Sequence, residues 1–271
     1  MQKRYLKRAA AVLMLGVSAA AMLTACKQKQ VVLDELPEGQ FDVRTLGADG
    51  GILNYTLPEK GEEIAVFQIR DYGDVKIRLF PDETPKGVEN FKKLVESGYY
   101  DELIFHRVVD GFVIQTGDPK GDGTGGKDAW GSETGFEQTV SSHLCHLTGA
   151  VAYAIGSDKM NKSQFYVVTG EEVTADVFSQ LRNYYGKTFT PSVEDLYYHA
   201  GGQPFLDGDY EIFGQVFDGL QYCLDIQKTE TDENQKPKQA VVVEKAYLTP
   251  YDGEAPHWLN AAGEEISAAA D

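Results

Sequence analysis

The pattern of apolar and polar positions along the chain predicts a domain made mostly of short β-strands. In the run DVKIRLF (74–80), three apolar residues alternate with Lys76 and Arg78, so one face of this strand should meet water. The run EEIAVFQIR (62–70) precedes it, and the DYGD between them is typical of a hairpin. Further β segments are predicted at 105–109, 113–117, 148–155, 163–169, 210–217 and 238–248.

Two helices are predicted between these strands. The first has Thr84 as a suitable cap, Pro85 in its first turn and Gly98 as its end. The second is predicted near 219–227. Many short strands with two helices favour a mainly β fold, namely a closed antiparallel barrel with a helix covering each end.

Residues 170–203 interrupt this rhythm and are interpreted as a helical insertion. The segments TADVFSQLRNYYG and SVEDLYYHAGG predict two short helices, capped at Thr174 and Ser192, and each is followed by a glycine. An excursion of this size costs little loop entropy, so the barrel can accommodate it.

The first residues are typical of an export signal. Four basic residues between Lys3 and Arg8 precede the apolar run 9–22. As a helix this run would reach about 21 Å, which is short of the roughly 30 Å hydrocarbon core, so a permanent transmembrane helix fits less well. Residues 1–25 are therefore predicted to be a signal peptide.

The residues that end this signal, LTAC (23–26), resemble a bacterial lipobox. In such sequences the signal is cut before the cysteine, and its sulfur carries a diacylglyceryl group. An ordinary secretory signal with a chance cysteine is the alternative. The resemblance implies a mature chain that starts at Cys26, 246 residues long, held at a membrane by a stable double acyl anchor. The lipoprotein style favours the extracytoplasmic face of a Gram-positive cell membrane.

The charge of the chain excludes some partners. Removing residues 1–25 deletes four positive charges and no negative ones, so the net charge moves from −17 to −21. Such a field repels nucleic acid and anionic headgroups, and the lipid must therefore provide the attachment. Cys145 and Cys223 could pair outside the cytoplasm, but their apolar settings favour buried free thiols.

The sequence thus divides into four parts: a signal peptide at 1–25, a tether and lead-in at 26–60, a folded domain at 61–253 that contains the insertion, and a flexible tail at 254–271.

The stretch FHRVVDGFVIQTGD (105–118) places long polar side chains on an otherwise apolar hairpin. With a three-residue loop at 110–112, Arg107 lies opposite Gln115, and both share a face with Phe105. A two-residue turn would instead place Arg107 opposite Ile114. The pattern alone leaves both registers open.

This stretch resembles the signature of the cyclophilin family of peptidyl-prolyl cis–trans isomerases. The likeness continues through GTGG (123–126), SQFYVV (163–168) and FLDGDYEIFGQV (205–216), and it covers roughly 62–249 apart from the insertion. Four blocks in the family's order are more specific than any single motif. The resemblance implies the eight-stranded antiparallel barrel with two capping helices, isomerase (rotamase) activity without a cofactor, and the register that pairs Arg107 with Gln115.

The resemblance also implies the residues of the site. Arg107 is the catalytic arginine and Gln115 the glutamine that orients it. The implied substrate-binding residues are Phe112, Val113, Tyr166 and Leu206 around the proline, Ala154 and Ile155 at the peptide backbone, Gln164 in support, and Phe205 and Tyr210 at the rim. Four of these depart from the family's common residues, namely Val113, Ile155, Tyr166 and Phe205, but the pocket stays apolar.

Other chemistry-bearing residues have simpler explanations. Rotation about an X–Pro bond needs no base, so His106 is interpreted as a satisfied structural histidine that faces the barrel interior. The HLCH segment (143–146) lacks a second ligand cluster, so no metal site is predicted. The GDGTGG segment (121–126) lacks the lysine of a phosphate loop and is interpreted as a loop of the barrel.

The predicted function is catalysis of X–Pro rotation in exported proteins that are folding, by a monomer. A catalytically weak module that only binds proline-containing peptides is the first alternative. A solute-binding lipoprotein is the second, although it would require a larger two-lobed chain of alternating β and α units.

Overall fold

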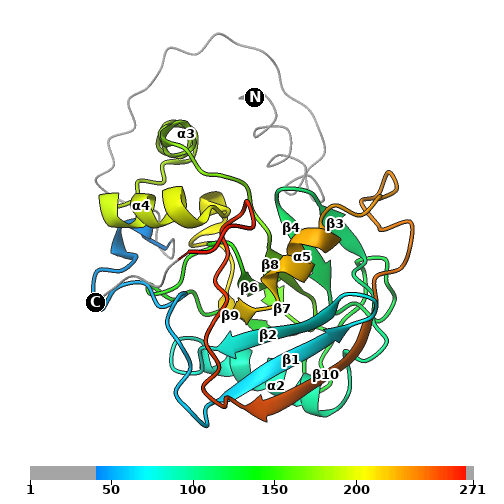
Figure 1. The fold of residues 1–271 in the computed structure, drawn as a ribbon. Helices are drawn as coiled ribbons and strands as arrows, with labels where there is room; N and C mark the ends of the chain where they lie inside the picture. Colours follow the sequence, from blue (N-terminus) through cyan, green and yellow to red (C-terminus); the bar gives the residue numbers. More distant parts are fainter. Residues whose placement is uncertain (1–40, 267–271) are drawn as a thin grey trace.

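The computed structural model describes residues 41–266 (Figure 1). The predicted signal peptide, Cys26 and the first part of the predicted tether lie outside these residues. Among the described residues, none of the helices has both the length and the apolar character needed to cross a bilayer.

An eight-stranded antiparallel sheet forms the centre of the fold, in the order β10-β1-β2-β9-β6-β8-β4-β3. All eight predicted β segments contain or overlap one of its strands. The strands are β1 (Glu63–Ile69), β2 (Gly73–Leu79), β3 (Arg107–Val109), β4 (Val113–Thr116), β6 (Ala150–Tyr153), β8 (Phe165–Val168), β9 (Ile212–Asp218) and β10 (Val243–Pro250). A separate two-stranded sheet pairs β5 (Phe136–Glu137) with β7 (Met160–Asn161).

The prediction of a closed barrel is not confirmed, because the sheet is an open half-barrel. Its two edge strands, β10 and β3, do not pair with each other. The segment before β3 instead meets the start of β10, through an isolated bridge between Ile104 and Val242 and backbone hydrogen bonds that Val243 makes with Glu102 and Leu103. β3 has three residues, and its Val108 N–H donates to the carbonyl of Gln235 at 2.8 Å. A loop therefore covers the edge where β10 would have to pair.

Within residues 41–266, four helices surround the sheet, as the sequence predicted. They are α2 (Pro85–Glu96), α3 (Ala175–Tyr185), α4 (Pro191–Ala200) and α5 (Leu220–Ile226). Two 3₁₀ helices, η1 (Val43–Thr45) and η2 (Pro204–Leu206), complete the described elements. The insertion helices α3 and α4 lie together at the opposite end of the molecule from α2 (Figure 1).

The helix boundaries follow the predicted signals with one exception. α2 begins after Thr84 with Pro85, although the Thr84 side chain makes no capping hydrogen bond. α3 begins after Thr174 and ends at Gly186, which has a φ of 68°. The predicted cap at Ser192 is wrong, because Pro191 takes the first helical position that its fixed φ favours.

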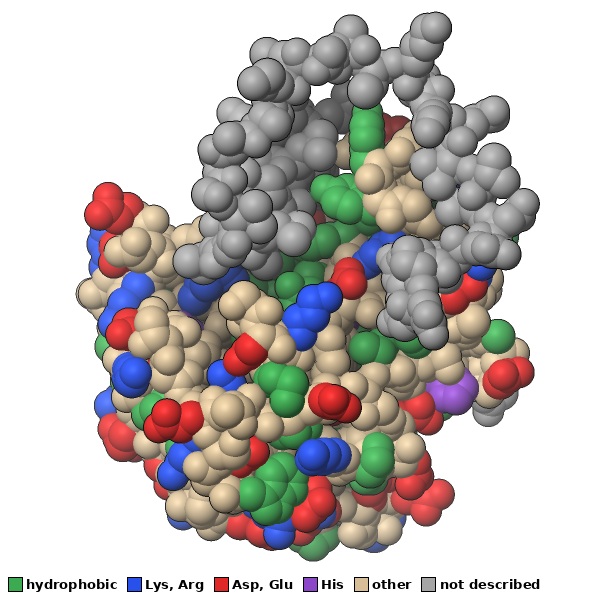
Figure 2. Space-filling model, turned by 180° about the vertical axis from the view of Figure 1, so that it is seen from behind, with side chains coloured by type: hydrophobic (Ala, Val, Ile, Leu, Met, Phe, Trp, Pro, Cys, Tyr) green, Lys and Arg blue, Asp and Glu red, His purple; other side chains and the backbone are tan. Residues whose placement is uncertain are grey.

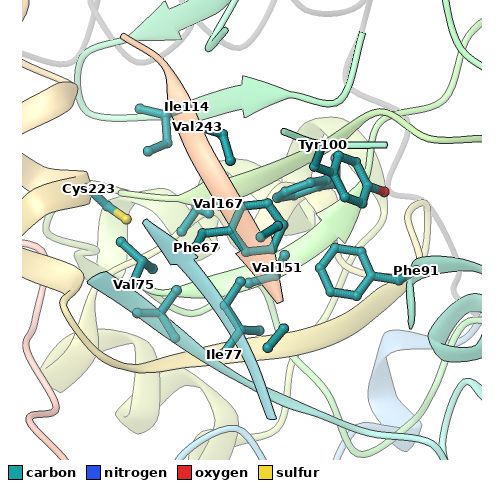
Figure 3. Packing of buried hydrophobic residues seen from close by; sticks show 14 of the residues in the cluster. Phe67, Val75, Ile77, Phe91, Tyr100, Ile114, Val151, Val167, Cys223 and Val243 are labelled. Atoms are coloured by element: carbon teal, nitrogen blue, oxygen red, sulfur yellow. The ribbon is translucent and has the colours of Figure 1, made fainter. Parts of the chain in front are cut away.

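The main core lies between the sheet and α2 and is rich in aromatic rings (Figure 3). Phe213 on β9 lies 4.7 Å from the Phe91 ring of α2 and 4.6 Å from Tyr153. Phe165 meets Phe91 edge-on at 5.4 Å. Such pairs stabilise beyond the area they bury, by about 0.5–1.5 kcal/mol each.

Segments on both sides of the predicted domain pack onto it, which corrects two boundaries. Val43 and Leu46, in the predicted tether, are buried with the apolar residues of α3 and α4. Trp258, in the predicted flexible tail, is 3 % exposed and meets the Tyr55 ring edge-on at 5.2 Å. Residues 41–60 and 254–266 therefore belong to the folded domain. A few large apolar side chains attach them to it, and these stand in sequence without a regular apolar pattern.

Cys145 and Cys223 are free and buried, which confirms the prediction that they do not pair. Burial raises the pKa of Cys145, and it raises the pKa of Cys223 to about 12. Both thiols therefore act as small apolar groups.

The surface carries charges of both signs. On the face in Figure 2, acidic and basic side chains are interspersed and no continuous basic patch appears. The ion pairs are mostly exposed, for example Arg70 with Glu102 at 2.8 Å, and exposed pairs of this kind contribute little stability.

A buried carboxylate beside β9 couples folding to pH. Glu211 is 1 % exposed, and its Oε2 accepts hydrogen bonds from the Thr139 N–H at 2.5 Å and the Asn161 side chain at 2.7 Å. Its Oε1 has no hydrogen-bond partner among the described residues. Burial raises the pKa of Glu211 from 4.5 to about 7, because the two hydrogen bonds only partly offset the lost solvation.

We expect Glu211→Gln to become the more stable form as pH rises. Because the folded protein binds the Glu211 proton more tightly than the unfolded chain does, protonation stabilises the fold. This contribution is complete below about pH 4.5 and is lost as pH rises through about 7. Between pH 4.5 and pH 8, the free energy of unfolding of the variant should gain on the wild type by about 3 kcal/mol at most. Urea unfolding at both pH values measures this, with Glu244→Gln on the exposed part of β10 as the matched control. Equal pH dependence in wild type and Glu211→Gln would contradict it.

Candidate active site

The hairpin of β3 and β4 places Arg107 opposite Gln115. Val108 faces Ile114 and Val109 faces Val113, which is the register of a three-residue loop. Gly111 in this loop has a φ of 71°, a conformation that glycine adopts without a steric penalty. The structure thus decides between the two registers that the sequence pattern left open.

The two faces of this hairpin enter different apolar clusters. Val108 and Ile114 lie in the main core, while Val113 lies in a second cluster that we call the pocket cluster. Phe105 was expected on the face of Arg107 but lies in the main core. The alternation fails there because the strand starts only at Arg107.

The Arg107 side chain lies at the edge of the pocket cluster. Its Cζ is 5.8 Å from the centre of the Phe112 ring, and its Nε donates a hydrogen bond to Gln235 Oε1 at 2.8 Å. Burial lowers the pKa of Arg107, which a guanidinium tolerates without losing its charge near neutral pH. The result is a partly desolvated cation with one fixed nitrogen.

Gln115 and Gln164 form a second polar group beside the arginine. Gln115 Nε2 donates to Gln164 Oε1 at 2.9 Å, and Gln164 Nε2 donates to the carbonyls of Gly125 at 2.7 Å and Gly123 at 3.1 Å. The GDGTGG loop therefore supports Gln164. Gln115 lies opposite Arg107, but Arg107 donates its side-chain hydrogen bond to Gln235.

Sequence analysis missed Gln235. It lies in the turn-rich segment between α5 and β10, outside every block of the resemblance, and its φ of 67° is unusual for a residue other than glycine. No periodic pattern marks such a loop residue. A long amide side chain in a turn of otherwise polar residues was the only available signal.

The predicted pocket residues come together from β4, β8, η2 and the loops beside them. Phe112, Val113, Tyr166 and Leu206 are buried in the pocket cluster, and Ala154, Phe205 and Tyr210 pack against it with part of their surface exposed. The rings of Phe112 and Phe205 stack with centres 5.9 Å apart. Ile155 is half-buried just beyond β6. An apolar surface with exposed aromatic edges thus lies next to the guanidinium.

A buried polar network lies behind this surface. The Tyr166 hydroxyl is 3.1 Å from His146 Nε2, and His146 Nδ1 is 2.7 Å from the Asp207 carboxylate. The second carboxylate oxygen accepts a hydrogen bond from the Tyr197 hydroxyl at 2.6 Å. His146, which the sequence raised only as a possible metal ligand, therefore connects a pocket wall to the insertion.

His106 is buried next to Arg107 in the sequence, and burial lowers its pKa. Neither of its ring nitrogens has a hydrogen-bond partner among the described residues. The prediction of a buried histidine is therefore confirmed, but the prediction that its hydrogen bonds are satisfied is wrong. Between residues 41 and 266, no cluster of three or more histidine, cysteine or acidic side chains is arranged to hold a metal ion.

Comparisons with known proteins agree with this architecture. Residues 64–248 match the family described as cyclophilin type peptidyl-prolyl cis-trans isomerase/CLD. A Staphylococcus aureus protein (strain USA300) named for peptidyl-prolyl cis-trans isomerase activity is 40 % identical over 182 residues, covering 67 % of this chain and 90 % of the relative. A Staphylococcus epidermidis protein of the same name matches equally well.

Solved structures give the same result. A Cryptosporidium parvum cyclophilin type isomerase, crystallised in the presence of the dipeptide Ala-Pro, has a TM-score of 0.54 and 27 % identity and covers 69 % of this chain and 99 % of its own. A second crystal structure of the same enzyme has a TM-score of 0.55 and 26 % identity, and the match covers 70 % of this chain and 98 % of the other. The chain belongs to the cyclophilin-type peptidyl-prolyl cis–trans isomerases, and it is an isomerase of X–Pro bonds.

We expect Gln235→Ala to lower kcat/KM about tenfold, because a charge-assisted hydrogen bond contributes roughly 1.5–3 kcal/mol and part of it should carry over to the transition state. An NMR exchange assay on an Ala-Pro peptide measures the rate. Asn234→Ala, one residue earlier in the same loop, is the matched control and should retain wild-type activity. Unchanged kcat/KM in folded Gln235→Ala would show that this hydrogen bond does not position the arginine.

Proposed function

We propose that Arg107 accelerates X–Pro rotation by stabilising the twisted amide, while the pocket cluster grips the proline ring. The barrier is the partial double bond of the amide, about 18–20 kcal/mol, and rotation breaks no σ bond. A catalyst therefore only has to bind the twisted form better than either planar form. In the twisted form the proline nitrogen regains a lone pair that a guanidinium can stabilise.

The observation that carries the proposal is the position of the charge. Arg107 is partly desolvated beside the Phe112 ring, and Gln235 fixes only its Nε. Within the described part of the chain, its terminal Nη groups have no hydrogen-bond partner, which leaves them available to a substrate. A preorganised donor of this kind needs no reorganisation when the substrate twists.

The magnitudes require the pocket as well. A charge-assisted hydrogen bond contributes about 1.5–3 kcal/mol, or roughly one to two decades in rate. An acceleration of five decades needs about 7 kcal/mol. Phe112, Val113, Tyr166 and Leu206 would supply much of the rest by holding the ring while the preceding residue rotates.

The remaining site residues fit the substrate's other groups. Ala154 and Ile155 lie where β6 ends and would meet the peptide backbone, and Phe205 and Tyr210 would bound it at the rim. The Cryptosporidium parvum structure determined in the presence of Ala-Pro supports a proline-containing peptide as the ligand. Tyr166 and Phe205, which differ from the family's common residues, would set the preference among peptides.

The clients we propose are exported proteins. Residues 1–26 support this, because the basic start, the apolar run and LTAC together favour a lipid anchor on Cys26 at the outer face of the cell membrane. A monomeric isomerase held there would act on polypeptides as they emerge and fold.

Arg107→Ala should lower kcat/KM by about two orders of magnitude with the fold intact. The measurement is the exchange rate of an Ala-Pro peptide at several enzyme concentrations, and circular dichroism verifies folding. Arg70→Ala is the matched control, since Arg70 is an exposed arginine paired with Glu102. A folded Arg107→Ala protein with wild-type turnover would contradict the mechanism. A wild-type protein that binds the peptide without accelerating exchange would favour the weak binding module.

Lipidation has its own test. In a Gram-positive host that expresses the full chain and is fed an alkyne fatty acid, the wild type should become labelled and Cys26→Ser should not. Cys145→Ser controls for general effects of losing a thiol and should remain labelled. Label retained by Cys26→Ser, or absent from the wild type, would contradict the lipid anchor.

A further inference from the structure

The insertion at 170–203 returns to the loop that carries two pocket residues. Lys187 follows α3, and its Nζ donates to the carbonyls of Phe205 at 2.7 Å and Asp207 at 2.6 Å. It also pairs with the Asp209 carboxylate at 2.6 Å. The Lys187 side chain is only 12 % exposed, and these contacts use all three of its N–H donors.

A second contact comes from α4. The Tyr197 hydroxyl donates to Asp207 Oδ2 at 2.6 Å, and Tyr197 is 0 % exposed. Asp207 Oδ1 is bonded to both the backbone N–H and the ring of His146, at 2.8 and 2.7 Å. Asp207 is therefore held on one side by the insertion and on the other by the residue that contacts Tyr166.

The turn on the other side of the pocket is also tied to the insertion. Gln203, the last residue of the insertion, donates from Nε2 to the carbonyl of Gly111 at 2.8 Å. Gly111 precedes Phe112, whose ring stacks on Phe205. Both aromatic walls of the pocket thus depend on contacts made by residues of the insertion.

The loop around η2 has few internal hydrogen bonds to fix its conformation. η2 is a three-residue 3₁₀ helix, and its internal bonds are those from Leu206 N–H to the Gln203 carbonyl at 3.0 Å and from Asp207 N–H to the Pro204 carbonyl at 3.3 Å. So short a turn is marginal by itself. The buried contacts of Lys187 and Tyr197 supply what the turn lacks.

We propose that Lys187 and Tyr197 are positioning residues that hold Phe205 and Leu206 against the proline ring, so that the insertion sets the affinity of the pocket for X–Pro peptides. This inference rests on the proposed function. The two residues do not touch the reacting amide. Their loss should therefore weaken ground-state and transition-state binding alike, which raises KM and leaves kcat nearly unchanged.

The test uses Lys187→Met, which keeps most of the stem and removes the three donors, and Tyr197→Phe, which removes one hydroxyl. KM and kcat come from NMR exchange of an Ala-Pro tetrapeptide, and Kd comes from titration of the Leu206 methyl signals. We expect KM and Kd to rise five- to tenfold with kcat within twofold. Lys93→Met is the matched control, because Lys93 is a lysine of α2 paired with Glu89.

The outcomes separate this inference from the proposed function. If the wild type accelerates exchange and Arg107→Ala lowers kcat/KM as predicted, but Tyr197→Phe and Lys187→Met are folded with unchanged KM and Kd, the positioning role is overturned. If Lys187→Met does not fold, Tyr197→Phe alone decides, since it deletes a single oxygen. Wild-type protein without any acceleration would instead refute the proposed function.

Discussion

The account depends on keeping a guanidinium charged at the edge of an apolar pocket. Removing a charge from water is costly, and the lowered pKa of Arg107 reflects that cost. The hydrogen bond to Gln235 and the face of the Phe112 ring offset part of it. An ammonium would lose its proton more readily in such a place, and a fully solvated arginine would gain little from meeting the substrate.

Segments outside the main sheet hold this arrangement together. β3 does not pair with β10, and the loop that covers this edge of β3 brings Gln235 to the arginine. On the opposite side of the pocket, Lys187 from the insertion holds the turn with Leu206. The sheet supplies the register, while the loops determine where the charge and the aromatic walls lie relative to each other.

The sequence predicted the elements better than the contacts between them. The pattern of apolar residues located the eight strands of the main sheet but not β5 and β7, and caps and glycines located the helices, because these signals are local. Closure of the sheet, the packing of Trp258 and the partner of Arg107 depend on chain segments far apart in sequence. Family resemblance named residues that the structure brings together in the pocket cluster, but it could not find Gln235 or Lys187, which lie outside its blocks.

The most direct test follows the Arg107 Nε–Hε signal in a ¹H–¹⁵N spectrum while an Ala-Pro peptide is added. The account predicts that this signal and the Leu206 methyl signals shift together with the same Kd, because the peptide meets the charge and the pocket at once. Leu206 signals that shift while the Arg107 signal stays unchanged at saturation would contradict it.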